Sequence, residues 1–532
     1  MAQFRLNAYD ADLYVPSFLG LRQNDIGLNP DMRFAAEAEN VETPNGVLQP
    51  RAASVVLDGE FPQKIEMLMR FHRRYYSGSG KDWLVAAVGG KLYQKQEGNG
   101  GWEQIQMPTG ISSFQSNVWS WVTYEVNVEG TDYPVDVLVI SNAYDGMFLV
   151  IPSDLHKTWG MIKKQTWEEL KNSTWQKTYD PQWLVFPVDT KGNKFSVIER
   201  HDERIWGGGI IGKEDYLYYS APYDPLDWEA NTEIPEDGAG EIMLPSWDGD
   251  MFTTLRSFGE NLIAFKKRRL WRIIGTNPGE YDIKEQYGGG APYPFTVRTN
   301  IERILMVCSE GLSVYDGMSV SPYAREMVEQ LWKTVNRSAL DQMVAEIYKE
   351  KYYLAFPVGN STVNNALLIY DLREGTILYH TDIYIESILA TDERLYATTS
   401  TLPGRLTEIH YNSWDEGAAS GAATKWETPW LDFGRKDIQK GGFDLYFIPE
   451  VQDTAVTLKF SVQTEKKVKT KQYTVQPLTE EQRAVNREHR GKRLHFGGNG
   501  RRFRIRIETA AGVTAPWRLI GGLHLIVETD PD

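Results

Sequence analysis

The chain alternates short apolar runs with turn residues over most of its length. In "VLVISNAYDGMFLVI", residues 137–151, two apolar runs flank Asn-Ala-Tyr-Asp-Gly. Because Asp145-Gly146 readily adopts the positive φ angles of a tight turn, this stretch predicts a β-hairpin. Similar patterns begin at the following residues: Trp83, Val137, Arg204, Asn261, Ile304, Tyr352 and Arg394. Their spacings of 54, 67, 57, 43, 48 and 42 residues lie near the ~40–50 residues of a propeller blade.

Several of these apolar runs are continuous, as at residues 137–140 and 304–307, where a one-sided sheet would alternate. Sheets packed face to face around an axis bury both faces of their middle strands. We therefore expect an all-β fold with an irregular six- or seven-bladed β-propeller over residues 63–424, and an N-terminal arm, residues 1–62, that contributes a strand to it. Because the repeats lack a strict WD40 or kelch signature, several unrelated β-sandwiches are the alternative.

Two segments depart from strand character. Residues 322–350 space their apolar positions as two short helices broken around Asn336, which predicts a helical insertion. Residues 154–183 are polar and rich in tryptophan, and they lengthen one repeat. This second insertion is a candidate interface loop, with aromatic caps folded onto the nearest blade as the alternative. Its candidate interface residues are Trp159, Trp167, Trp175 and Trp183.

The chain changes character near residue 425, after a Gly- and Ala-rich linker without periodicity. Beyond it, stretches such as "AVTLKFSVQTEKKVKTKQYTV" and "RRFRIRIETA" alternate apolar and polar positions, as strands with one solvated face do. Residues 425–532 are therefore expected to form a separate C-terminal β-sandwich.

Composition adds a charge asymmetry to this picture. The net charge of the 532 residues is −15, yet residues 425–532 hold 19 Lys and Arg against 14 Asp and Glu, net +5, which leaves −20 for residues 1–424. Two parts of opposite sign are expected to face different partners. The single cysteine, Cys308, excludes an internal disulfide framework. The sequence has no signal-peptide pattern at its start and no apolar run of membrane-spanning length, so we expect a soluble protein without a membrane anchor, made in a cytoplasm.

Motifs for chemistry are scarce. The eight histidines form no HExxH pattern. "GGGIIG", residues 207–212, formally matches GxGxxG, but a turn and a strand follow it where a dinucleotide site needs a helix. Two carboxylates from distant blades can converge without leaving a linear motif, so glycoside cleavage stays a possible activity. We predict no catalytic residue, no metal ligand and no cofactor, and hence a protein that is not an enzyme.

The terminal region carries two basic rows. In extended strands, alternate residues share a face, so each row is expected to present its charges together. The rows are Lys467, Lys469 and Lys471, and Arg502, Arg504 and Arg506. A nucleic-acid surface is one interpretation. A solvated sheet face, or contact with an acidic protein neighbour, is the favoured one, because stacking aromatic residues are sparse there.

The stretch at residues 18–53, "FLGLRQNDIGLNPDMRFAAEAENVETPNGVLQPRAA", resembles the opening of a group of bacteriophage tail proteins. The shared phrases are "GLN" at residues 27–29, "A-x-NV" at residues 38–41 and "G-x-L-x-PR" at residues 46–51. Later phrases fit the same pattern in order, including "EGLSVYDGMSVSPYAREMVEQLW", "YKEKYYLAFP", "NNALLIYDL" and "WETPWLDFG". Most of the chain is covered, and the nearest group is the tail nozzle or hub proteins of short-tailed phages, also called packaged-DNA stabilisation proteins.

This resemblance implies a structural virion protein of the phage tail. It implies a homo-oligomeric ring of six copies below the portal and adaptor, in contact with other tail proteins, that retains packaged DNA and conducts it during ejection. Double-stranded DNA would pass through the lumen without sequence-specific binding, which suits the acidic body, because phosphate contacts by Lys or Arg would slow its passage. A receptor- or glycan-binding tail protein is the alternative function, and a propeller glycosidase is a third.

Overall fold

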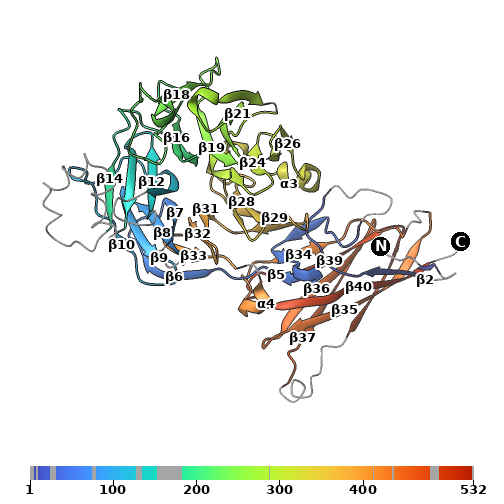
Figure 1. Ribbon diagram of the computed structural model, residues 1–532. Helices are drawn as coiled ribbons and strands as arrows, with labels where there is room; N and C mark the ends of the chain where they lie inside the picture. Colours follow the sequence, from blue (N-terminus) through green and yellow to red (C-terminus); the bar gives the residue numbers. More distant parts are fainter. Residues whose placement is uncertain are drawn as a thin grey trace.

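The computed structural model describes residues 5–6, 10–23, 31–74, 80–126, 135–152, 183–286, 288–410, 412–433, 437–479 and 491–529. Strands dominate these residues, and they form several four-stranded and two five-stranded antiparallel sheets. The expected all-β class is confirmed (Figure 1).

Six four-stranded sheets are each built from four strands that follow one another along the chain. The first two comprise β7 (Met67–Arg74), β8 (Gly80–Val88), β9 (Lys91–Gln96) and β10 (Glu103–Gln104), then β11 (Ser120–Val126), β12 (Val135–Asn142), β13 (Gly146–Ile151) and β14 (Leu184–Pro187). The third and fourth comprise β15 (Val197–His201), β16 (Arg204–Gly208), β17 (Tyr216–Tyr219) and β18 (Gly240–Met243), then β19 (Phe252–Phe258), β20 (Asn261–Lys266), β21 (Leu270–Ile274) and β22 (Asp282–Gln286). The fifth and sixth comprise β23 (Arg298–Thr299), β24 (Ile304–Cys308), β25 (Gly311–Tyr315) and β26 (Val320–Pro322), then β27 (Val344–Tyr348), β28 (Lys351–Phe356), β29 (Ala366–Asp371) and β30 (Ile377–Thr381).

A seventh sheet combines strands from two distant parts of the chain. β31 (Ile385–Ala390), β32 (Leu395–Thr399) and β33 (Leu402–Glu408) pair in order, and β6 (Val55–Glu60) adds the outer strand antiparallel to β33. Leu57 of β6 packs on a buried cluster with Tyr396 and Leu406. A strand from before residue 62 thus pairs with the last strand of the array.

The seven sheets pack face to face in a closed series. Consecutive sheets share apolar clusters. Leu138 of the second sheet and Phe71 of the first belong to one cluster, and Leu255 of the fourth sheet and Trp206 of the third belong to another. The series closes because Leu84 and Ala86 of the first sheet share a cluster with Leu389 of the seventh. The first strands of neighbouring sheets are also in contact, β7 with both β11 and β31. This arrangement of sheets around one centre is that of a β-propeller, and it is called the ring below (Figure 1).

The hairpin at residues 137–151 shows why the pattern predicts strands. β12 pairs with β13, with Asn142 opposite Gly146. The Asn142 side chain accepts hydrogen bonds from the backbone N–H groups of Tyr144 (2.8 Å) and Asp145 (2.7 Å). Gly146 has φ +102°, a backbone conformation that L side chains rarely adopt. The continuous apolar run of β12 is buried on both faces, because the first sheet covers one side and the third sheet covers the other.

The segment between β26 and β27 is helical over part of its length. It contains the 3-10 helix η7 (Arg325–Val328), the one-turn α-helix α3 (Glu329–Trp332) and the 3-10 helix η8 (Arg337–Gln342). Asn336 caps η8, its side chain accepting from the backbone N–H of Ser338. Val328, Leu331 and Leu340 are buried, which explains the apolar spacing in the sequence.

Two five-stranded sheets form the terminal domain, and both contain strands from the first 40 residues. One has the order β1 (Arg5–Leu6), β2 (Asp10–Val15), β40 (Trp517–Thr529), β35 (Lys440–Val451) and β38 (Lys492–Gly500). The other has the order β3 (Glu37–Glu39), β34 (Thr424–Glu427), β39 (Phe503–Thr509), β36 (Val456–Thr464) and β37 (Val468–Val475). Their apolar faces meet where Phe447 lies 4.3 Å from Phe460, centroid to centroid. The short strands β4 (Val41–Glu42) and β5 (Gln49–Pro50) pair with each other, and the 3-10 helix η1 (Pro44–Gly46) lies between them in the chain. β4 contacts β30 of the ring, and β5 contacts β40 of the terminal domain. The one-turn helix α4 (Ser413–Glu416) lies next to β5 (Figure 1).

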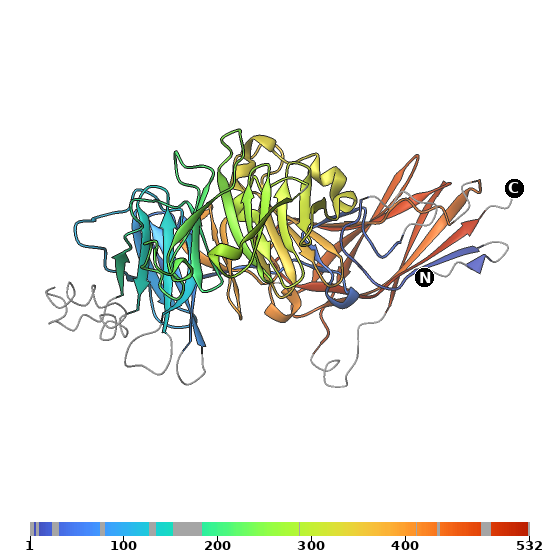
Figure 2. The same ribbon diagram turned by 45° about the horizontal axis from the view of Figure 1, so that its top comes forward.

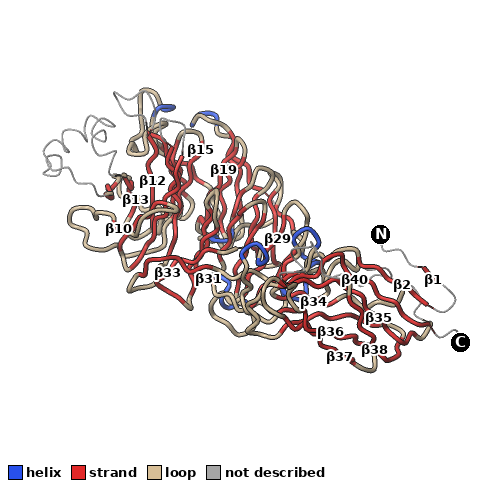
Figure 3. Tube along the Cα trace, turned by 90° about the horizontal axis from the view of Figure 1, so that it is seen from below, coloured by secondary structure: helices blue, strands red, loops and turns tan. Residues whose placement is uncertain are grey.

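The molecule is elongated, with the terminal domain projecting from one side of the ring (Figures 2 and 3). One continuous apolar core spans both parts, because a single cluster contains Leu354 of the sixth sheet, Phe18 of the N-terminal segment and Phe460 of the terminal domain. The ring and the terminal domain therefore share one core.

Candidate functional site

The opening phrases of the resemblance, at residues 38–41 and 46–51, lie where the ring meets the terminal domain. Residues 18–23 and 35–52 run through this place, called the joint below, and contact both parts. Residues 24–30, which include the "GLN" phrase, lie outside the described residues. The joint has an apolar half and a polar half.

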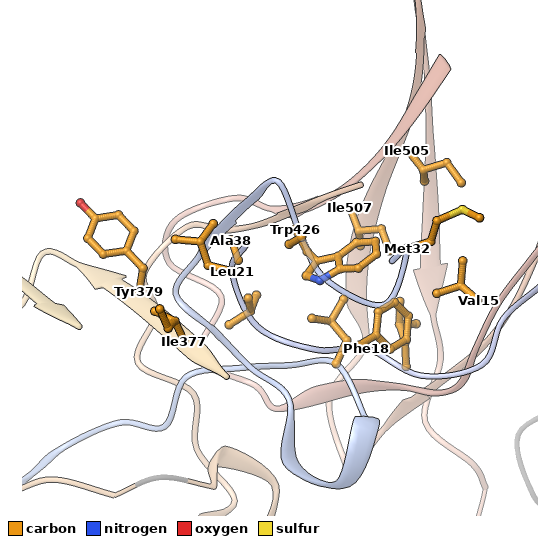
Figure 4. Close-up of a cluster of buried hydrophobic side chains, with 14 of the residues drawn as sticks. Val15, Phe18, Leu21, Met32, Ala38, Ile377, Tyr379, Trp426, Ile505 and Ile507 are labelled. Atoms are coloured by element: carbon orange, nitrogen blue, oxygen red, sulfur yellow. The ribbon is translucent and has the colours of Figure 1, made fainter. Parts of the chain in front are cut away.

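The apolar half is centred on Phe18 and Trp426, whose rings meet edge to face at 5.0 Å (Figure 4). Both side chains are fully buried. The indole N–H of Trp426 donates to the carbonyl oxygen of Leu19 at 3.4 Å. Trp426 belongs to β34 of the terminal domain, so this contact fastens the N-terminal segment to that domain.

The same segment is fastened to the ring by backbone contacts. The N–H of Leu21 donates to the carbonyl oxygen of Ile377, in β30, at 2.6 Å. A Cβ on Gly20 would lie 2.0 Å from that oxygen, so only glycine allows the two backbones to come this close. This explains why the "FLGLR" stretch contains a glycine at this position.

Asn40 organises the polar half. Its side-chain N–H groups donate to Thr381 Oγ1 (2.8 Å) and to the carbonyl oxygen of Ala423 (2.9 Å). Its Oδ1 accepts from Arg51 Nε (3.1 Å) and from the backbone N–H of Thr381 (2.9 Å). Asn40 has φ +55°, a left-handed conformation that asparagine tolerates better than most residues. One amide thus links the ring at Thr381 to the start of the terminal domain at Ala423.

Three ionisable groups are buried beside Asn40. Burial lowers the pKa of Arg51, whose Nη2 donates to the carbonyl oxygens of Thr381 (3.3 Å) and Asp382 (3.4 Å). Burial raises the pKa of Glu42 well above its usual value, although its carboxylate accepts from the backbone N–H of Ala52 at 3.3 Å. Burial, with a smaller contribution from the Arg51 charge, lowers the pKa of His380 to about 3, so its imidazole is neutral in the folded protein.

The polar groups of the joint contact one another and the backbone of both parts. Glu42, Arg51 and His380 line a small pocket with apolar side chains such as Leu367 and Ile369. Arg51 donates through Nε and Nη2, and Asn40 accepts through Oδ1, so the two side chains hold the two parts in a fixed relation. Sequence reasoning did not single out Asn40, Glu42 and Arg51 as site residues. The sequence does hold a signal for them. Charged residues in a segment whose apolar residues are buried are expected to be buried too, and a buried charge needs a partner.

The tryptophan candidates fall in two places. Trp159, Trp167 and Trp175 lie outside the described residues. Trp183 is 4% exposed and packs against Trp83, centroids 4.8 Å apart, and Phe71, 5.7 Å. Trp183 therefore belongs to the core between the first and second sheets and is not on the described surface.

The arginine row lies on the outer face of its sheet and is neutralised there. Arg504 and Arg506 both pair with Glu427, whose side chain is fully buried; the Arg504 Nη1 to Glu427 Oε1 distance is 2.5 Å. Arg502 approaches Glu465 at 3.5 Å. The strand register explains this, because Arg506 lies directly opposite Glu427 in the neighbouring strand.

The lysine row projects from the opposite face of the same sheet. In the strand register, Lys471 lies opposite Phe460 and Lys469 lies opposite Val462, and both apolar side chains face inward. Arg504 and Arg506 instead lie opposite Gln463 and Ser461. Lys467, Lys469 and Lys471 are nevertheless exposed, because they lie on or next to the edge strand β37. The Nζ of Lys471 lies 5.9 Å from the ring centroid of Phe496 in the facing sheet. The two basic rows thus do not form one surface.

Ion pairs join the first strands of neighbouring sheets in the ring. Arg74 pairs with Glu125, Arg200 with Glu125 (3.4 Å), Arg256 with Glu199 (3.4 Å) and Arg298 with Glu346 (3.2 Å). The Arg256 guanidinium also donates to the carbonyl oxygen of Val297 at 3.0 Å, which links the fourth sheet to the fifth. These pairs hold neighbouring sheets in register around the centre.

One group of His and Asp side chains has the spacing of metal ligands. Ligand atoms of His72, Asp82 and Asp392 lie within 4.8 Å of one another. The Arg70 guanidinium already lies among them, donating to Asp82 Oδ1 (2.8 Å) and Asp392 Oδ1 (2.7 Å). The protein's own cation therefore neutralises this group, and we assign no metal to it.

No helix within the described residues is long and apolar enough to cross a membrane. No protein-family model matches the chain, and no curated protein is significantly similar to it. Among solved structures, the Neurospora crassa Pan2 WD40 domain is similar at 8% sequence identity, with a TM-score of 0.33 over 77% of this chain and 98% of that one. A likeness at this level carries no argument about fold or function.

Proposed function

We propose that this chain is a structural, non-enzymatic component of a phage tail that forms an oligomeric ring of copies. The observation that supports this most is the joint. The phrases that resemble tail nozzle and hub proteins, at residues 38–41 and 46–51, supply Asn40 and Arg51, which connect ring and terminal domain through hydrogen bonds. A rigid body with two differently charged parts suits a scaffold that contacts several neighbours.

We also propose the finer architecture that this function uses. Each four-stranded sheet is taken as one blade of a seven-bladed propeller, and the two five-stranded sheets are taken as a β-sandwich. The pairing of β6 with β33 and the contact between Phe447 and Phe460 support these two assignments.

The DNA path in this proposal runs between copies and not through the centre of one propeller. The first strands of neighbouring sheets touch around that centre and are bridged by pairs such as Arg200 with Glu125. The net −20 of residues 1–424 suits a body that faces DNA without binding it, since affinity for a duplex grows with each Lys or Arg on a phosphate. The copies would number six, below the portal and adaptor, in the virion tail.

The experiment is genetic and structural. Virions that lack the protein should lose packaged DNA, so their genome should become sensitive to added nuclease, and expression of the wild-type chain should restore protection. Electron micrographs of wild-type virions should show the protein as a ring on the tail axis. Peripheral spikes, together with nuclease-resistant DNA in the deletion particles, would overturn the proposal.

Exposed aromatic residues favour a receptor- or glycan-binding tail protein as the second candidate. Trp247 is 88% exposed and Tyr223 is 59% exposed, and Trp and Tyr are enriched among the residues that contribute most to binding at interfaces. Binding of purified protein to host cells that is lost on Trp247→Ala would support this function. Unchanged binding by that variant would contradict a receptor- or glycan-binding role of Trp247.

A further inference from the structure

The lysine row lies on an unpaired sheet edge. β37 is the last strand in the order β3, β34, β39, β36, β37, and no other described strand pairs with its outer edge. Such an edge exposes backbone N–H and C=O groups and is a natural place for another chain to dock. Val468, at its start, is 57% exposed, so the edge combines positive charge with an apolar side chain.

These lysines have no acidic partner in the described part of the chain. No carboxylate oxygen there lies within 4.0 Å of the Nζ atoms of Lys467, Lys469 or Lys471, although Arg502 and Arg504 nearby are paired with Glu465 and Glu427. Three positive charges without an acidic partner in the described residues therefore lie along this edge, where a partner with opposite charge would be attracted.

The ring carries a complementary surface, the acidic loop, residues 231–237, just before β18. Every residue of this loop is exposed, and Glu233, Glu236 and Asp237 surround Ile234, which is 52% exposed. Neither Lys nor Arg occurs between Ala221 and Gly240. The negative charge of this loop is thus opposite to that of the lysines along the β37 edge.

The acidic loop is held in place by a buried arginine. Arg204, 2% exposed, donates from Nη1 to the carbonyl oxygens of Ser220 and Gly238, both at 2.7 Å, and from Nη2 to that of Glu236. Asn231 Oδ1 accepts from the backbone N–H groups of Glu233 and Ile234, both at 3.0 Å. A loop ordered before binding loses less conformational entropy on docking.

We propose that the acidic loop of one copy docks on the β37 edge of the terminal domain of the next copy. The inference rests on the proposed ring of copies and names the contact that builds it. Figure 1 places β18 on the part of the ring far from β37, so the two surfaces of one chain do not meet. A contact between two different surfaces is heterologous, and successive copies joined by it close into a ring or extend as a filament.

Charge reversal tests the contact in the full-length protein. Glu233→Lys/Glu236→Lys/Asp237→Lys, and separately Lys467→Glu/Lys469→Glu/Lys471→Glu, should each weaken self-association about tenfold or more in analytical ultracentrifugation, with the loss largest at low salt. The variant that carries all six substitutions should recover the self-association of the wild type. The matched control Glu66→Lys/Asp341→Lys/Glu350→Lys changes three exposed acids elsewhere and should associate as the wild type does. Each variant should keep the wild-type circular dichroism spectrum.

Disulfide trapping gives a second readout that does not depend on affinity. In a Cys308→Ser background, a mixture of the Ile234→Cys and Val468→Cys variants should form a crosslinked dimer of the two chains, and the doubly substituted chain should form a ladder. Val118→Cys, at a residue 50% exposed elsewhere on the ring, replaces Ile234→Cys as the control and should not crosslink to Val468→Cys.

The outcomes separate this inference from the proposed function. If the copies of both charge-reversed variants assemble normally and no crosslink forms, the proposed contact is wrong, but the proposed assembly of copies in the tail is not affected. Absence of any self-association and of any crosslink in the wild-type background would contradict both. Weakened association in both variants, recovery in the combined one and a specific crosslink would establish the contact.

Discussion

The ring and the terminal domain are both antiparallel, yet they draw their strands from the chain in different ways. Six sheets of the ring use four consecutive strands each. Both sheets of the terminal domain instead join a strand from the first 40 residues, β2 or β3, to strands from residue 424 onward. The ring is therefore a series of local units, and the terminal domain depends on contacts between the two ends of the chain.

This difference shows that the N-terminal segment holds the two parts of the molecule together. The N-terminal segment takes part in both terminal sheets, in the joint and, through β6, in the seventh sheet of the ring. Contacts across such large sequence separations form late and cost more loop-closure entropy than local hairpins do. We expect local changes in one ring sheet to be tolerated better than changes in the segment that links the parts.

The largest expected effect comes from the shared core. Trp426→Ala should lower the free energy of unfolding by about 3–5 kcal/mol, because it empties a fully buried site between the N-terminal segment and the terminal domain. Urea unfolding followed by circular dichroism measures it. Trp247→Ala, at an 88% exposed position of the ring, should change it by no more than about 0.5 kcal/mol. Similar losses in the two variants would contradict the shared core.

The next effect is a pH dependence at the ring side of the joint. His380 has a folded pKa of about 3, below the unfolded value of about 6.5, so the unfolded state binds the proton first. Its contribution to stability is fully present above pH 6.5 and is lost as the pH falls toward 3. Relative to His380→Leu, the wild type should therefore lose about 2 kcal/mol between pH 7.5 and pH 5. Urea unfolding of both proteins at the two pH values checks this, and parallel pH profiles would show that the imidazole is not buried as described.

A smaller effect separates backbone strain from hydrogen bonding at Asn40. Asn40→Gly and Asn40→Ala both remove the side-chain bonds to Thr381, Ala423 and Arg51. Only the alanine variant must also hold φ +55° with a Cβ, so it should be less stable than the glycine variant by about 1 kcal/mol. Thermal unfolding of the pair measures the difference. If alanine proved as stable as glycine, the joint would not be held in the left-handed conformation.

The smallest effect concerns the strand that closes the ring. The pair Arg405 to Glu60, at 2.7 Å, links β33 and β6 but is exposed on both sides. Glu60→Gln should therefore cost less than about 1 kcal/mol. Leu57→Ala, which removes an apolar contact with the cluster around Tyr396 and Leu406, should cost more. The reverse order, measured by urea unfolding, would mean that charge and not packing closes the ring.

The comparison also explains what could be predicted from the sequence. Hairpins such as that at residues 137–151 were readable, because turn residues and apolar runs are neighbours in the chain. The pairing of β2 with β40 and of β3 with β34 has no local signal, so sequence analysis placed the terminal domain within residues 425–532 alone. Strand pairing between distant segments depends on the rest of the fold, which periodicity cannot report.

The candidate site residues could also be predicted only where the signal was local in the chain. Alternation placed Lys469 with Lys471, and Arg504 with Arg506, on common faces of their own strands, as the register has them. It could not show that the two rows point to opposite faces, because that depends on the strand β36 between them. Trp183 was grouped with the other insertion tryptophans by sequence proximity, whereas the first two sheets bury it.

The most direct test of the account is a cryo-EM map of the intact particle in which this chain can be traced. We predict copies arranged as a ring around the tail axis, each with its acidic loop against the β37 edge of the next copy and with the DNA path between copies. Single chains or peripheral clusters, without contact between the loop and that edge, would contradict it.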